Sequence, residues 1–566
     1  MSRMGRTINP GRWTSALLSL VVVGNSALFA QDPACKPALI QKPQIIEWKA
    51  LDGNQIKCTI ASDGPYADYR ATNTAGFEWP KASGKTAIYT AGIWVVGRHV
   101  PSDSLRTAVM DYNSEYQPGP LLETFNTSTN DDIGPVSRAV DPRYRLYRIE
   151  RNDTISTDYV EWPGDLGAPY VDVNANGSWD QGIDKPRLYG DQQIWCVIND
   201  VNKAQHVVLG ATQPMGVEVR VLYWVLDQPG VLGNTMFIRW QIMNRSDADY
   251  DSVYLALWDD VDLGYPSDDL PGCDATLDMG YVYNGDNDDA WSSGYGSTPP
   301  AIGMVFLQGP IVPGLPGDVA QFAEGLKPGF RNLGMTSFLP SACGTYPLLN
   351  CPPDGEPDYA PMAYNYLQAK LATGADLTRP DSSIIKFVFS GDPVSGTGDL
   401  PPDFPLGPWR PQEAYVLTNT GPFTLAQGDT QEVVAAVVMS QGTDRLNSVS
   451  RLKEDVAAVH ELYMSGIVVD ARSEEARVPE TYELLQNYPN PFNPSTTIRY
   501  GLPSRSHVTL TVFNTLGQEV ATLVQGEQEA GFHEAVFDAS GLASGVYLYR
   551  LTAGSYVETR KLALVR

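Results

Sequence analysis

The fold class follows from residues 217–225, which read Val-Glu-Val-Arg-Val-Leu-Tyr-Trp-Val. Residues of the β-branched and aromatic kinds recur there at a period of two, which is typical of a half-buried strand. Similar runs lie at residues 87–96, 207–210, 236–244, 252–258, 423–425 and 432–439. Many short strands separated by turn residues predict a mainly β protein whose body is a large β-sandwich.

The composition fits many turns and an acidic surface. The chain of 566 residues contains 51 Gly and 43 Pro, and its formal net charge is -26. Residues 1–30 carry +3 and residues 482–566 carry -1, which leaves -28 on residues 31–481. This charge argues against nucleic acid as a partner, because nucleic-acid binders carry a basic surface. It suits solubility and divalent cations.

Long loops and one late helix complete the body. Residues 259–415 are rich in Asp, Gly and Pro, so we expect loops that extend from a sheet. Asp444 can cap a helix that Gly466 ends. Apolar residues recur between them at steps of three and four, at Leu446, Val449, Leu452, Val456, Val459 and Leu462.

The two ends of the body are marked by a leader and a linker. Residues 1–30 combine three arginines, a short apolar run and small residues before Gln31, which predicts a Sec signal peptide cleaved after Ala30 and export through the periplasm. The apolar run is too short to span a membrane, and we expect no transmembrane segment in the mature chain. The body then covers 31–466, with a division into two packed β subdomains near 205–240 left open. Residues 467–481 have linker composition.

Six cysteines occur in a chain that we expect to leave the reducing cytoplasm. Cys343 and Cys351 are the closest pair and bracket turn residues. We expect a disulfide between them, and the other four cysteines can be buried thiols.

Residues 482–566 read as a separate compact β domain. Short strands are predicted at residues 497–502, 507–514, 519–524, 532–537, 546–552 and 556–565. Three motifs of this segment closely resemble the C-terminal sorting domain of type IX (Por) secretion substrates, which has an immunoglobulin-like fold related to the flagellar hook-capping protein. They are Pro489-Asn490-Pro491, Gly545-Val546-Tyr547 and the final strand from Lys561 to Arg566.

The resemblance implies delivery through the outer membrane by the type IX machinery, to the cell surface or the medium. The body resembles large exported proteins of no assigned activity that carry the same domain. Its motifs include Gly76-Phe77-Glu78-Trp79-Pro80-Lys81 and Tyr283-Asn284-Gly285-Asp286.

The segment from Asp172 to Asp184 has the spacing of a calcium loop. Oxygen-bearing side chains stand at loop positions 1, 3, 5 and 9, Gly177 stands at position 6, and the Ser178 carbonyl can serve at position 7. Position 12 is Ile183, so the loop would have to close on Asp184 instead. The alternative is a turn held by its own side chains. The proposed ligands are Asp172, Asn174, Asn176, Ser178, Asp180 and Asp184.

A second group of carboxylates follows the strand at 252–258. So many acids would repel one another unless they are solvated or bridged by a cation, and calcium is the cation we expect. The candidates are Asp259, Asp260, Asp262, Asp268, Asp269, Asp274 and Asp286.

Catalytic signatures are mostly missing from the sequence. No H-E-x-x-H or G-x-S-x-G motif occurs, and Gly84-Lys85-Thr86 lacks the leading glycine of a phosphate-binding loop. We therefore favour a non-enzymatic surface protein with a structural, adhesion or polymer-binding role, for which surface polysaccharide and lipopolysaccharide are candidate partners. An extracellular polysaccharide hydrolase that uses carboxylates in the loops is the alternative.

Overall fold

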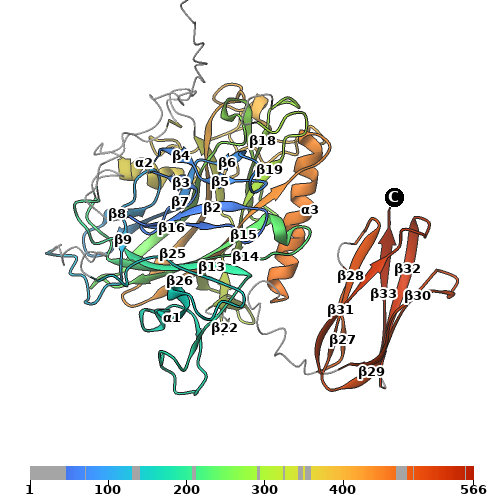
Figure 1. Cartoon of the computed structure of the whole chain (residues 1–566). Helices are drawn as coiled ribbons and strands as arrows, with labels where there is room; N and C mark the ends of the chain where they lie inside the picture. The colour runs from blue at the N-terminus through green and yellow to red at the C-terminus, as the bar shows by residue number, and fades with distance from the viewer. Residues whose placement is uncertain are drawn as a thin grey trace, which may run out of the picture.

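The computed structural model describes residues 46–70, 72–129, 141–206, 212–289, 294–322, 325–341, 349–350, 359–466, 481–487, 490–528, 530–554 and 556–565. The predicted signal peptide, the run at 207–210, the pair Cys343 and Cys351, and the sorting residues Pro489 and Arg566 lie outside these ranges. The fold is mainly β, as the sequence predicts (Figure 1).

The largest sheet of the body is nine-stranded and antiparallel, in the order β10-β13-β14-β15-β26-β19-β18-β17, with β9 also paired to β13. Its strands are β9 (Gln117–Pro118), β10 (Tyr147–Glu150), β13 (Gln192–Asn199), β14 (Val217–Val225), β15 (Thr235–Asn244), β17 (Asp269–Asp274), β18 (Met279–Asn284), β19 (Ala301–Gln308) and β26 (Thr430–Ser440). The stretch that decides the fold class, β14, therefore lies inside this sheet and is paired on both sides.

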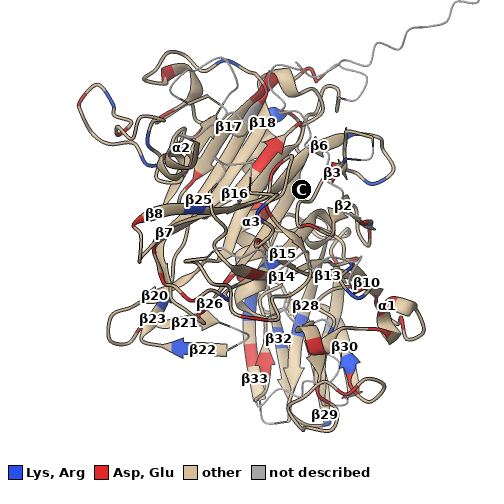
Figure 2. Cartoon of the chain, turned by 90° about the vertical axis from the view of Figure 1, so that its left-hand side faces the viewer, with Lys and Arg blue, Asp and Glu red and all other residues tan. Residues whose placement is uncertain are grey.

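The second large sheet is five-stranded, in the order β24-β25-β16-β7-β8, and Figure 2 shows β25 and β16 side by side. Its strands are β7 (Thr90–His99), β8 (Ser104–Val109), β16 (Tyr250–Val261), β24 (Ser337–Ser341) and β25 (Ala414–Leu425). A four-stranded sheet contains β1 (Trp48–Leu51), β2 (Lys57–Ala61), β5 (Phe77–Glu78) and β6 (Thr86–Ile88).

Four short ribbons extend from these sheets. They pair β3 (Asp68–Tyr69) with β4 (Thr74–Ala75), β11 (Tyr170–Val171) with β12 (Lys185–Pro186), β20 (Ile311–Pro313) with β23 (Phe330–Asn332), and β21 (Val319–Phe322) with β22 (Gly325–Pro328).

The two large sheets pack face to face. A Cβ atom built on Gly280 of β18 would come within 2.2 Å of Thr418 Oγ1 in β25, so a glycine is needed at this contact between the sheets. The opposite face of the nine-stranded sheet is covered by α3, whose Leu452 side chain lies against Gly303 of β19. One continuous hydrophobic core joins the sheets and α3. The described cysteines Cys58, Cys196 and Cys273 are buried free thiols within it, and burial raises their pKa values.

Three α-helices occur in the described chain. The predicted late helix is α3 (Arg445–Met464), and Asp444 caps it by accepting hydrogen bonds from Leu446 N and Asn447 N. The short helices α1 (Thr157–Val160) and α2 (Tyr359–Tyr366) were not expected. In the part of the chain that the structure describes, no helix has the length and apolar character needed to cross a membrane.

Residues 259–415 differ from the expectation of long loops, because they supply β17, β18, β19 and β24 as well as loops. These strands contain glycines at close contacts, including Gly272 beneath the Tyr281 ring, which hide the alternation of large apolar residues that marks a strand.

The C-terminal segment forms an immunoglobulin-like sandwich with a hydrophobic core of its own. One sheet has the order β27-β28-β31 and the other β30-β29-β32-β33. The strands are β27 (Glu483–Leu484), β28 (Ser495–Leu502), β29 (Ser506–Phe513), β30 (Glu519–Gln528), β31 (Gly531–Asp538), β32 (Gly545–Ala553) and β33 (Tyr556–Leu564). The six strands predicted for this segment are all present.

Candidate metal centre and sorting tail

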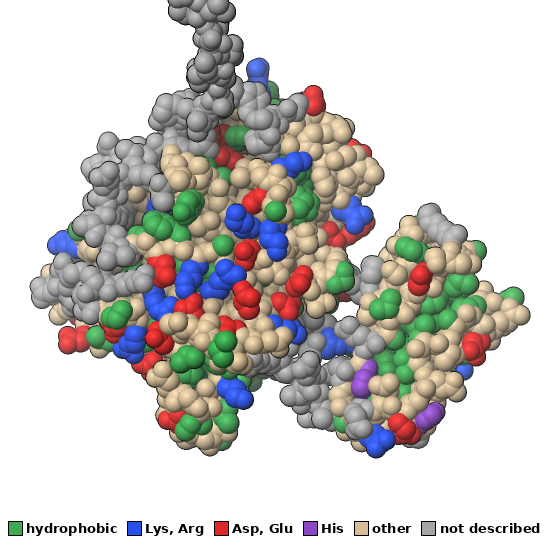
Figure 3. Space-filling view, viewed as in Figure 1, with side chains coloured by type: hydrophobic (Ala, Val, Ile, Leu, Met, Phe, Trp, Pro, Cys, Tyr) green, Lys and Arg blue, Asp and Glu red, His purple; other side chains and the backbone are tan. Residues whose placement is uncertain are grey.

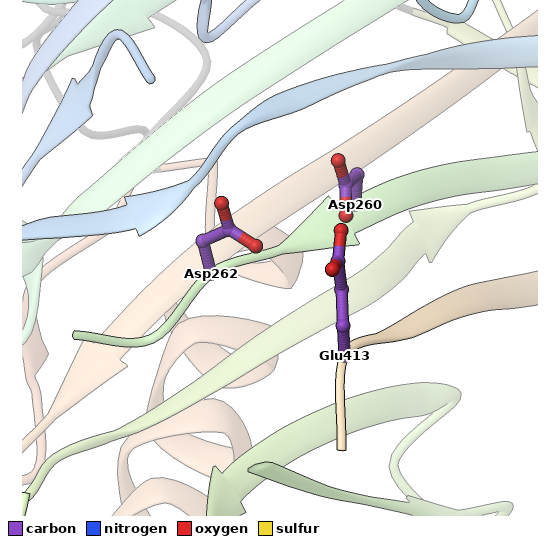
Figure 4. Close-up of side chains that lie close together, drawn as sticks. All are labelled: Asp260, Asp262 and Glu413. Carbon is purple, nitrogen blue, oxygen red and sulfur yellow. The ribbon is translucent and has the colours of Figure 1, made fainter. Parts of the chain in front are cut away.

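Asp260, Asp262 and Glu413 form a buried carboxylate cluster where β16 ends and β25 begins. Asp260 and Asp262 are two residues apart, and such side chains point to the same face of an extended chain. The register pairs Val261 with Ala414, so continuing it by one residue places Glu413 opposite Asp262. One oxygen atom of each residue lies within 4.8 Å of the others (Figure 4). Strand pairing between distant parts of the chain therefore assembles the cluster.

The cluster is shielded from solvent. Asp260 is fully buried and Asp262 is 5% exposed, whereas Glu413 is half-buried. The Tyr112 hydroxyl donates to Asp260, and Tyr415 Oη donates to Glu413 Oε1 at 3.5 Å. Three carboxylates this close repel one another strongly unless they are protonated or bridged by a cation.

Aromatic packing fixes these two donors. The Trp258 ring stacks on the rings of Trp94 and Tyr415 with centroids 5.9 Å apart in both pairs. Tyr112 meets Trp258 edge-on at 5.5 Å. The cluster therefore rests on a rigid layer of rings in the core of the five-stranded sheet.

Asp269, the first residue of β17, lies between the two strand ends. Its backbone carbonyl accepts from Gln412 N and its Oδ2 accepts from Leu263 N, each at 3.1 Å. The side chain is fully buried, and its Oδ1 has no hydrogen-bond partner among the described residues. Burial raises the pKa of Asp269 well above its usual range, and the negative charges of Asp268 and Asp262 raise it further.

Two more carboxylates share this acidic environment. Asp259 lies on the other face of β16, where it accepts from Tyr66 Oη at 3.0 Å. Burial raises the pKa of Asp259 to about 7 against the effect of that hydrogen bond. Burial likewise raises the pKa of Asp268 to about 6. Burial therefore favours the protonated form of both side chains.

The other two predicted ligands of this group, Asp274 and Asp286, lie at the end of β17 and in the turn after β18. Asp274, at the far end of β17 from Asp269, accepts from Thr276 N at 3.1 Å and forms an ion pair with Lys453 at 3.4 Å. Asp286 accepts from Asp288 N at 2.8 Å in the turn after β18. The structure thus brings Asp260 and Asp262 together and adds Glu413, which the sequence analysis missed. The sequence offered only one signal for Glu413, its position directly before the strand β25.

The loop from Asp172 to Asp184 connects β11 with β12 and gathers its own side-chain oxygens. Asp172 Oδ2 accepts from Gly177 N at 2.7 Å. Asp180 Oδ2 accepts from the amides of Asn174 at 2.7 Å and Asn176 at 2.5 Å. Ser178 is exposed, and its N–H donates to Asn176 Oδ1 at 2.8 Å.

This loop closes on Asp184. Its Oδ1 accepts from Val173 N at 2.9 Å and its Oδ2 accepts from Asp180 N at 2.7 Å. Ile183, at the position that an EF-hand fills with its closing acid, is 51% exposed. The five Asp and Asn residues predicted as ligands therefore turn toward one another, and their contacts in this structure are those of a self-bonded turn.

A groove of about 870 Å³ lies beside β20, β23 and the start of β26. Phe322, Phe330 and Phe423 line it, and the Lys327 ammonium lies 4.2 Å from the centre of the Phe330 ring. On the face of the body shown in Figure 3, basic side chains lie among acidic ones instead of forming one basic patch.

The predicted sorting residues converge on β32 and β33. Ala563 N donates to Asn490 Oδ1 at 2.8 Å, which holds the Asn490-Pro491 segment along β33. Gly545 begins β32 opposite Leu564, and Tyr547 pairs with Leu562. The Lys561 carbonyl accepts from Gln486 Nε2 at 2.7 Å. Residues 486–565 match the family described as the secretion system C-terminal sorting domain.

The tail is a type IX sorting domain. The resemblance seen in its sequence is confirmed, and the protein is exported, either to the cell surface or into the medium. This domain implies an interaction with the secretion machinery. No curated protein matches the chain.

Solved structures with weak similarity to the chain include the following three. One is a polysaccharide lyase, with 8% identity over 61% of this chain and 34% of that one and a TM-score of 0.18. The others are latent PorU of Porphyromonas gingivalis (13%, covering 66% and 31%, TM-score 0.14) and PorZ of the same organism, a surface component of its type-IX secretion system (12%, 66% and 43%, TM-score 0.12). The chain spans less than half of each, and scores this low carry no argument about the body.

Proposed function

We propose that the body acts outside the outer membrane as a non-enzymatic binding protein for an external polymer, with loops stabilised by calcium. The protein leaves the cytoplasm by a Sec signal peptide, passes through the periplasm and is delivered by its type IX sorting domain. Surface polysaccharide and lipopolysaccharide are the candidate polymers. The sorting tail and the charge of -28 on residues 31–481 support this assignment.

The convergence of oxygens in the 172–184 loop is the observation that carries the calcium role. Asp172, Asp180 and Asp184 turn inward within one short connection, with two asparagine side chains between them. A calcium ion takes six to eight oxygens from such a turned backbone. Closure on Asp184 supplies the carboxylate that Ile183 cannot.

The groove at Phe322, Phe330 and Lys327 supports the binding role. Its volume of about 870 Å³ falls within the range of about 300–1,000 Å³ that is usual for ligand sites. The phenylalanine rings offer flat apolar surface, and the lysine offers a positive charge to an anionic group on the polymer.

The hydrolase alternative has less support. Glycosidases hold two carboxyl groups about 5–10 Å apart on either side of the substrate. The oxygens of the buried carboxylate cluster lie within 4.8 Å of one another, and Asp260 and Asp262 are buried. This spacing suits an ion better than a sugar ring.

Thermal melts in calcium and in EDTA test the calcium role. At a calcium concentration about 100-fold above Kd, one site stabilises the folded protein by about 2.7 kcal/mol, so chelation should lower Tm. Asp180→Asn should lose part of this response. Asp227→Asn, an exposed acid outside the loop, should keep all of it. Coincident melts of the unmodified protein in calcium and EDTA would refute the role.

Deletion of residues 482–566 tests the export route. The truncated protein should accumulate in the periplasm, as fractionation and surface labelling would show. Normal arrival at the surface would contradict the assigned route.

A further inference from the structure

We propose that one face of the β21–β22 ribbon docks on the surface of a phospholipid bilayer. The inference goes beyond the polymer groove, and it requires only that the protein is exported, which its sorting domain establishes.

The register of the ribbon separates its two faces. Residues directly opposite each other in a strand pair share a face, and neighbours along a strand alternate between faces. The opposite face, with Phe322 and Lys327, lines the groove of about 870 Å³. The outward face consists of Val319, Gln321, Leu326 and Pro328.

The outward face is apolar and exposed to solvent. Leu326 is 72% exposed and Val319 is 50% exposed. Two more apolar side chains adjoin the ribbon. Leu315, in the turn before β21, is 74% exposed, and Met464, at the end of α3, is 63% exposed with its Sδ 3.6 Å from Gln321 Nε2. Exposed apolar patches on soluble proteins mark sites of interaction.

The size and composition of this face favour a lipid surface over a protein partner. Each strand of the ribbon has four residues, so the face covers about 13 Å by 10 Å. In Figure 2 the ribbon lies at the rim of the body beside β20 and β23. A stable protein complex buries about 800 Å² on each partner and is rich in aromatic anchors. A lipid interface is fluid, so a few projecting aliphatic side chains enter it without a surface of complementary shape.

Cations of the same segment suit the phosphates of lipid headgroups. Arg331 in β23 is exposed, and neither Arg331 nor Lys327 forms an ion pair with a carboxylate of the described residues. Asp318 accepts from a main-chain N–H of its own turn. The acids that line the groove, Asp251 and Asp429, belong to β16 and to the turn before β26. Basic side chains beside an inserted apolar face strengthen its attachment to anionic lipid.

Sedimentation with vesicles of phosphatidylcholine and phosphatidylglycerol tests the proposal on the exported protein recovered from cells. The unmodified protein should sediment with the vesicles. Leu326→Asp and Val319→Asp each place a charge on the outward face, and each should weaken vesicle binding about tenfold or more, because the lipid interface favours the aliphatic side chain and disfavours the charge.

Leu122→Asp is the matched control. Leu122 is also 72% exposed, but it lies in the loop after β9, outside the ribbon. This variant should bind vesicles as the unmodified protein does. All three substitutions are at exposed positions, so the variants should fold with unchanged Tm. The groove residues stay intact in all of them, so a failure of this proposal leaves the polymer role standing.

The outcomes separate a lipid surface from a second copy of the chain. Weaker vesicle binding in either ribbon variant, with the control unchanged, supports the proposal. Absence of vesicle binding by the unmodified protein overturns it, and so does binding that both ribbon variants keep or that the control loses equally. Sedimentation velocity supplies the last arm. A dimer that Leu326→Asp converts to a monomer, in a protein that ignores vesicles, would assign the face to a second copy.

Discussion

The 172–184 loop and the buried carboxylate cluster gather acidic side chains in opposite ways. In the loop, backbone N–H groups and asparagine amides donate to Asp172, Asp180 and Asp184, so the turn holds together through local bonds. In the cluster, strand pairing brings Glu413 opposite Asp262, and the Tyr112 and Tyr415 hydroxyls donate to Asp260 and Glu413. Local bonds between neighbours in sequence therefore assemble the loop, whereas the register of distant strands assembles the cluster.

The largest effect is expected from the ring layer beneath the cluster. Trp258→Ala removes a buried indole that stacks on Trp94 and Tyr415, and should lower the free energy of unfolding by about 3–5 kcal/mol. Trp179 in the loop is only partly buried and packs on Tyr170, so Trp179→Ala should cost about 1 kcal/mol. Urea denaturation of both variants measures the loss in the free energy of unfolding. Equal losses would contradict the expected difference between the two sites.

The difference between local contacts and contacts made by distant strands explains what the sequence could predict. The loop follows from the spacing of Asp172, Asn174, Asn176 and Asp180, since neighbours in a tight turn stay neighbours in space. The strand at 217–225 and the Asp444 cap were predictable for the same local reason.

Glu413 was not predictable, because its place depends on the register of β16 against β25. Asp274 was predicted as a ligand of the same group, but it lies away from the buried carboxylates. It follows Asp269 closely in sequence, but an extended strand places the two residues at opposite ends. Proximity along the chain is a good guide to ligands in turns and a poor one in strands.

A third group of buried carboxylates contains a histidine, which can supply a positive charge. His206 is buried with Nδ1 3.7 Å from Glu115 Oε2 and Nε2 3.5 Å from Asp200 Oδ2. Burial lowers the pKa of His206, but the two carboxylates outweigh it and the net pKa is raised. The folded state then holds the proton more tightly than the unfolded chain, which adds stability below about pH 6.5 that is lost as pH rises through the raised pKa.

His206→Gln should therefore destabilise the body most at acid pH, and the difference from the unmodified protein should shrink as pH rises. Denaturation midpoints between pH 5.5 and pH 8.5 provide the measurement. His507→Gln, an exposed histidine of the tail, is the control. A difference that does not change with pH would contradict the assigned charge of His206.

Loss of the Tyr112 hydroxyl, which donates to Asp260, should reduce stability less than loss of the Trp258 ring. Tyr112→Phe removes a hydrogen bond to a buried carboxylate and should cost about 1–3 kcal/mol in EDTA. Tyr415→Phe should cost less, because its bond to Glu413 is 3.5 Å long. Thermal melts of both variants in EDTA measure the two losses of stability. A larger loss for Tyr415→Phe would show that the hydrogen bond to Glu413 contributes more to stability than the bond to Asp260.

The smallest effect is expected at Ile183. An EF-hand closes on an acid at this position, but here Asp184 turns inward and Ile183 is exposed. Ile183→Glu should leave calcium affinity unchanged and alter stability by no more than about 0.5 kcal/mol, since its side chain faces solvent. Asp184→Asn, one residue later, should weaken calcium binding at the loop. A gain of affinity in Ile183→Glu would mean that the loop closes in the EF-hand register when calcium is bound, and that the contacts of Asp184 belong to the calcium-free turn alone.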